Sequence, residues 1–157
     1  MKEKLLHIYL ADHLAVAIGT HAVAKRCLQS NRDSPLGNYL AEGLIPELEE
    51  DRAALENVMD AVGAPKASYK QLTARAAAQV GRLKLNGRAL TYSPLSRLEE
   101  LEGLCLGVEG KVLLWTSLSS TPRAQRLGVD TNRLIERARA QRSHLEEHRL
   151  RAVEAAL

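Results

Sequence analysis

Clusters of turn-forming residues divide this 157-residue chain into a few long segments, and this division restricts the fold more than any other sequence feature. Between the clusters, the residue pattern predicts five helices. They are expected over 2–28, 34–62, 67–83, 93–118 and from 131 to near the end of the sequence.

Residues with a preference for helix ends mark several of these boundaries. Ser34 and Ser93 are each followed by Pro, an arrangement typical of an N-cap and a first helical residue. Asp130 is the expected cap of the last helix, and Gly63 is expected to end the second. Gly43 and Pro46 lie inside the second segment and predict a kink or a late helix start there.

The amino-acid composition favours the same all-α class. The chain has 27 Leu and 22 Ala against 9 Val and 4 Ile, with no Phe and one Trp. Leu and Ala favour helices, whereas β-branched and aromatic residues favour strands and the stacking platforms that bind single-stranded nucleic acid. We expect one domain over 1–157: an antiparallel four-helix bundle with helix 67–83 in the crossing between the second and third long helices.

Acidic side chains fall on the predicted apolar faces of two helices. The apolar face of the third long helix is expected to consist of Leu95, Leu98, Leu101, Cys105, Val108, Val112 and Trp115. The inward polar residues are Glu102 and Glu109 on this helix, Glu47 and Asp51 on the second, and His13 on the first. Ionised carboxylates in a helical interior are costly unless a cation or donor meets them, so we expect these side chains to converge.

Three sequence segments of distinctive composition lie on separate long helices. They are DHLA at 12–15, PELEEDRAAL at 46–55 and LEELEGLCLGVEGK at 98–111. This layout resembles the ferritin-like superfamily of helical bundles. More narrowly, EEDR, GRLKLNG and YSPLSRLxELExLxLGVxGK, together with DHLA, are similar to an uncharacterised bacterial family within that fold, to which no activity is assigned.

The ferritin-like resemblance implies a di-iron or di-manganese site. Such sites use one Glu on each of two helices and Glu-x-x-His on each of the other two. Here no Glu is followed three residues later by His, and His144 with Glu147 has the reverse order. An iron or manganese site at the five inward residues is therefore one hypothesis. The other is a buried charge network in which Arg52, Arg97, Lys111 or His13 meets the acids and fixes helix register.

A second candidate site is a basic segment at 61–98, which contains no Asp or Glu and seven Lys or Arg. Arg82, Lys84 and Arg88 lie near Gly81 and Gly87 and could bind an anion. No phosphate-binding fingerprint or nucleic-acid-reading motif accompanies them, which disfavours nucleic acid as the partner. The alternative is that these bases meet acidic groups within the chain or across a homo-oligomer.

The two cysteines and the hydrophobic runs indicate the cellular setting. Cys27 and Cys105 lack disulfide or zinc spacing, which is typical of reduced thiols in the cytoplasm. Lys25 and Arg26 are expected to lower the pKa of the Cys27 thiol, although no partners for nucleophilic catalysis can be identified. Charged residues interrupt the apolar run at 101–118, which disfavours a membrane span.

These patterns lead to three functional hypotheses. The first is a scaffold or interaction protein with a buried polar network, able to form homo-oligomers and without enzymatic activity. The second is a metal-binding, oxidoreductase-like bundle. The third is an anion-binding or nucleic-acid-binding module that uses segment 61–98.

Overall fold

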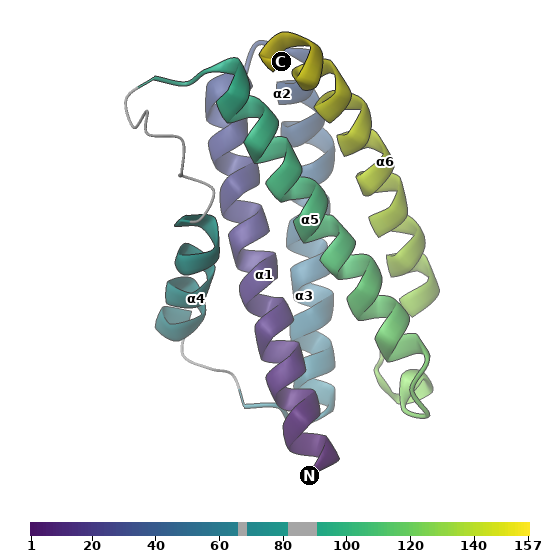
Figure 1. Ribbon diagram of the computed structural model, residues 1–157. Helices are drawn as coiled ribbons and strands as arrows, with labels where there is room; N and C mark the ends of the chain where they lie inside the picture. The colour runs from purple at the N-terminus through teal and green to yellow at the C-terminus, as the bar shows by residue number, and fades with distance from the viewer. Residues whose placement is uncertain (66–68, 82–90) are drawn as a thin grey trace.

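The structure, a computed structural model, describes residues 1–65, 69–81 and 91–157, and every regular element in these ranges is helical (Figure 1). The all-α class predicted from the sequence is confirmed for this part of the chain. The helices are α1 (Lys2–Asn31), α2 (Pro35–Tyr39), α3 (Ile45–Ala61), α4 (Tyr69–Gly81), α5 (Pro94–Ser119) and α6 (Thr131–Ala156). One π-helical turn (Leu40–Leu44) joins α2 to α3, and a 3₁₀ turn (Ala124–Arg126) lies between α5 and α6.

The predicted helix caps are present. Ser34 Oγ accepts a hydrogen bond from the backbone N–H of Gly37 at 3.1 Å. Ser93 forms a reciprocal capping box with Ser96 at the start of α5. The Asp130 side chain accepts from the backbone N–H of Arg133 at 3.0 Å at the start of α6. These side chains satisfy backbone donors that a helix leaves unpaired in its first turn.

The boundaries differ from the sequence prediction in two places. The first helix continues to Asn31 rather than ending at 28, because Asn31 Nδ2 donates to the carbonyl of Cys27 at 2.7 Å and is itself buried. Near Gly43 and Pro46, where a kink or a late helix start is expected, the backbone forms the π-helical turn and α3 begins at Ile45. Proline has no N–H for the regular helical bond, and a local change of helical register accommodates that loss.

The four long helices run alongside one another, with α3 and α5 pointing in the same direction (Figure 1). Helix α1 packs against α3, α4 and α5, and α5 packs closely against α6. Helix α4 lies on the outer side of α1 (Figure 1). No helix in the described ranges is both long and apolar enough to cross a lipid bilayer.

Two apolar clusters fill the interior, one toward each end of the long helices. The first includes Leu40, Leu104 and Leu145. The second includes Leu10 and Trp115. The residues between these clusters along α3, α5 and α6 include buried polar side chains, which form the candidate site described below.

Helices α1 and α5 approach closely where Thr20 faces Gly107. A Cβ atom added to Gly107 would lie 2.1 Å from Thr20 Oγ1 and 2.8 Å from its Cγ2, closer than atoms can pack. Thr20 Oγ1 donates to the Val16 carbonyl at 2.8 Å, which fixes this side chain against its own helix. The glycine therefore sets the distance between the two helices.

Gly107→Ala is expected to destabilise the protein by about 2 kcal/mol, because the added methyl forces the helices apart. The measurement is urea unfolding followed by circular dichroism. Gly110→Ala is the matched control on the same helix: its Cβ would meet Val16 at an ordinary 3.8 Å. The control should be neutral or stabilising by up to about 1 kcal/mol, since Ala favours helix over Gly. Equal effects of the two substitutions would contradict the close approach at Thr20.

Candidate functional site

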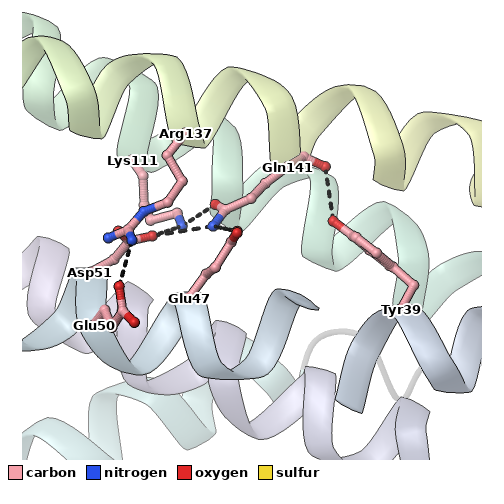
Figure 2. A network of polar contacts seen from close by, with 7 residues as sticks. All are labelled: Tyr39, Glu47, Glu50, Asp51, Lys111, Arg137 and Gln141. Atoms are coloured by element: carbon pink, nitrogen blue, oxygen red, sulfur yellow. Dashed lines mark hydrogen bonds and ion pairs between the residues drawn. The ribbon is translucent and has the colours of Figure 1, made fainter. Parts of the chain in front are cut away.

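A buried ion pair joins α5 to α3 at mid-length. Lys111 Nζ donates to Asp51 Oδ2 at 2.5 Å, and the two residues are 8% and 4% exposed. Lys111 also donates to Gln141 Oε1 on α6, and Gln141 is 2% exposed (Figure 2). One ammonium group therefore contacts polar groups from two other helices.

Arginine and glutamate side chains extend this cluster toward the surface. Arg137 on α6 donates to Asp51 Oδ1 and, at 2.6 Å, to Glu50 Oε2 (Figure 2). Gln141 Nε2 donates to Glu47 Oε2 at 2.6 Å. The Asp51 carboxylate is thus held by two cations, and Glu47 by an amide. We call Glu47, Glu50, Asp51, Lys111, Arg137 and Gln141 the central network.

The central network compensates the cost of burying its charges. Removing a carboxylate or an ammonium from water costs several kcal/mol, and only well-placed partners offset this cost. Burial lowers the pKa of Lys111 from its ordinary value, and the adjacent Asp51 carboxylate opposes that shift. Because Lys111 donates to a carboxylate and an amide oxygen, its charged form has partners that replace water.

Sequence periodicity identified only part of the central network. Asp51 is buried and Glu47 is half-buried beside it, as the pattern on the second segment predicts. Gln141 on α6 is also buried and was not among the predicted inward residues. Arg137 was missed because it lies beside the buried Leu134 and Ala138 on α6, and its long side chain reaches inward from there.

The inward placement predicted for Glu102 and Glu109 is wrong, because both are exposed. Glu102 lies 3.7 Å from Arg149 at the surface. Lys111, expected as a partner for these acids, pairs with Asp51, and Arg52 lies 3.5 Å from Glu56 on its own helix.

The physical reason is that α5 is apolar on two sides. Its buried face contains Leu104, Lys111 and Leu114. On the opposite side, Leu106 and Leu113 are 72% and 58% exposed. Hydrophobicity alone therefore places the centre of the buried face too close to the exposed leucines. Leu95, at the start of the predicted face, is 38% exposed and Val112 is half-buried. The other residues of that face are buried: Leu98, Leu101, Cys105, Val108 and Trp115.

His13 lies at the edge of the interior, half-buried, against the edge of the Tyr9 ring. The two ring centroids are 4.5 Å apart. Burial lowers the pKa of His13 from its ordinary value of 6.5, and the neighbouring Asp12 carboxylate opposes the shift without cancelling it. His13 lines the same small cavity as Asp51 and Lys111.

A second polar cluster lies near the N-terminal end of α5 and was not predicted from the sequence. Glu100 is 5% exposed and accepts from Arg26 Nε at 2.6 Å and from the Tyr92 hydroxyl at 3.0 Å. Asn31 Nδ2 donates to the same Tyr92 oxygen at 2.8 Å. These contacts hold the residues before α5 against the end of α1.

Cys27 lies beside this second cluster, and its pKa is shifted opposite to the sequence prediction. Burial, together with the nearby Glu100 carboxylate, raises the pKa of the Cys27 thiol to about 12. Both cysteines are free and buried. The adjacent Lys25 is exposed, so solvent screens its charge from the thiol. Burial therefore favours the protonated thiol at Cys27.

The predicted metal and anion sites have different outcomes. Within residues 1–65, 69–81 and 91–157, no group of three or more His, Cys, Asp or Glu side chains is arranged to hold a metal ion. The structure brings Glu47 and Asp51 together and leaves Glu102 and Glu109 on the surface. Arg82, Lys84 and Arg88 lie outside the described residues.

Comparisons of this chain with protein-family models, curated proteins and solved structures found no match.

Lys111→Met is expected to destabilise the protein by about 3 kcal/mol, because it leaves the buried Asp51 carboxylate with one cation and Gln141 without its donor. Urea unfolding measures this loss. In Asp51→Leu/Lys111→Met, where apolar groups replace both charges, much of the loss should be recovered. The control is Arg52→Met, which removes a partly exposed pair within α3. Its effect should stay below about 0.5 kcal/mol, and a control as damaging as Lys111→Met would argue against a special role of the interior pair.

Stability should fall as the pH falls below 6.5, in part because of His13. Burial lowers its folded-state pKa from the ordinary value of 6.5. Between the lowered value and 6.5 the unfolded chain binds more protons, so folding becomes less favourable as the pH drops through this window. His13→Gln should flatten this part of the curve of urea midpoint against pH. His148, whose pKa is also lowered by burial, accounts for a remaining slope. An unchanged slope in the His13→Gln/His148→Gln variant would contradict this assignment.

Proposed function

We propose that this chain is a ferritin-like four-helix bundle that serves as a scaffold and self-associates through the outward face of α5. The helix directions support the ferritin-like arrangement. Helices α3 and α5 run parallel (Figure 1). The connection between them in the sequence contains α4, which lies on the outer side of α1. Ferritin-like bundles have one long crossover connection, whereas simple up-and-down bundles have only short loops.

The scaffold role is supported by the central network, in which each carboxylate is held by a partner within the chain. Lys111 and Arg137 hold Asp51, and Gln141 holds Glu47. A carboxylate that already has two cations as partners is a poor candidate for binding a metal ion. Such a network instead favours one alignment of α3, α5 and α6, since any shift of one helix would leave buried charges unpaired.

The interaction role rests on a surface of α5, which we call the α5 stripe: Leu95, Glu102, Leu106, Glu109 and Leu113. All five residues are exposed. The sequence Glu-Gly-x-x-Leu occurs twice, at 102–106 and 109–113, one heptad apart. A heptad repeat of leucines with small neighbours is the pattern by which two helices pack side by side.

The α5 stripe is self-complementary in an antiparallel pair. When Leu106 faces Leu113 of a second copy, Glu102 faces Ser117 of that copy, so these acids avoid one another. Only Glu109 lies close to its own symmetry mate. The apolar contact therefore favours association and one pair of like charges opposes it. Salt screens that repulsion, so the dimer should strengthen as ionic strength rises.

Sedimentation equilibrium tests this proposal. The wild-type chain is expected to form a dimer, more strongly at high salt, and Leu106→Ser/Leu113→Ser is expected to be monomeric with an unchanged helical spectrum. Leu150→Ser is the matched control, because Leu150 is 52% exposed on α6 and lies outside the α5 stripe. A wild-type chain that stays monomeric at high concentration and high salt, or a double variant that still dimerises, would overturn the proposal.

A further inference from the structure

A small cavity lies beside the central network, between α1, α3 and α5. Its volume is about 20 Å³, and its polar lining includes His13, Asp51, Lys111 and Trp115. A cavity needs a volume of roughly 10–15 Å³ to hold one water molecule, and the water needs two to four polar partners. The cavity meets the size requirement for a single water and is too small for a metabolite.

Two hydrogen-bond donors at this cavity have unused capacity. Trp115 is 1% exposed, and its indole Nε1 has no hydrogen-bond partner among the described residues. A buried indole N–H normally has an acceptor. The Lys111 ammonium has three N–H groups, of which Asp51 and Gln141 accept two. Lys111 and Trp115 are four residues apart on α5 and therefore lie on the same side of the helix.

We infer that this cavity is a binding site for one water molecule, which accepts hydrogen bonds from Lys111 and Trp115 and donates to Asp51 and His13. Through His13, the water links α1 to a network that otherwise joins α3, α5 and α6. This water site is independent of the self-association through the α5 stripe, which does not require it.

The charges around the cavity favour water over a small anion. Asp51 balances Lys111, and Arg52 is paired with Glu56. The lowered pKa of His13 keeps its imidazole neutral at pH 7. A halide ion would add a buried negative charge without a free cation among these residues, and the cost of such a charge is large. A neutral molecule that both accepts and donates hydrogen bonds matches the lining.

Nuclear magnetic resonance of the intact protein tests the site directly. Trp115 is the only tryptophan, so the spectrum has one indole N–H resonance. This proton is expected to show a cross-peak to water with the sign of a long-lived complex. Lys111→Met should abolish the cross-peak, whereas Lys25→Met, at an exposed lysine of α1, should leave it unchanged.

Three results would overturn the inference. They are no cross-peak in the wild type, a cross-peak that persists in Lys111→Met, and an indole shift that titrates with bromide but not with sulfate, which would indicate a halide. If Lys111→Met does not fold, oxygen-17 relaxation dispersion of the wild type and Trp115→Phe replaces it. One long-lived water should then be lost in the variant, and equal numbers in the two proteins would contradict the site.

Discussion

The pairing of Lys111 with Asp51 across the interior is the interaction on which the arrangement of the long helices depends. It lies between two apolar clusters, which by themselves would tolerate small displacements of one helix along another. Leucine contacts are non-directional, and a core rich in Leu and Ala can repack at modest cost. The contacts of Lys111 with Asp51 and Gln141 are directional, because displacement of one helix would leave a buried charge or amide without a partner. Apolar burial therefore supplies the stability, and the polar layer selects one register.

The same part of the interior depends on small side chains. Thr20 of α1 contacts α5 at Gly107, one helical turn before Lys111, so α1 and α5 are close beside the polar layer. At the same level of the interior, the long Lys111 side chain reaches from α5 to the Asp51 carboxylate on α3. The close contact between α1 and α5 and the polar layer therefore lie at one level of the bundle.

Local signals in the sequence predicted the helices well, and tertiary placement was predicted less well. Ser34, Ser93 and Asp130 specify helix starts through bonds to their own backbone neighbours, so no distant contact is needed to locate them. Asp51 was placed inward correctly because its helix has a single apolar face. Glu102 and Glu109 were misplaced because α5 has leucines on two sides, and periodicity cannot distinguish a buried leucine from an exposed one. The inward reach of Arg137 depends on its side-chain conformation, which periodicity does not encode.

The two-sided character of α5 also connects the interior to the surface. One side of this helix supplies Lys111 to the central network, and the opposite side presents Leu106 and Leu113 to solvent. Because the interior network fixes the rotation of α5 about its own axis, it also fixes which residues lie outside. The proposed self-association would then depend on Lys111, although this residue is buried and does not contact the second copy of the chain. A loss of the interior pair would weaken association by allowing α5 to rotate, and the apolar stripe would no longer be presented as one continuous surface.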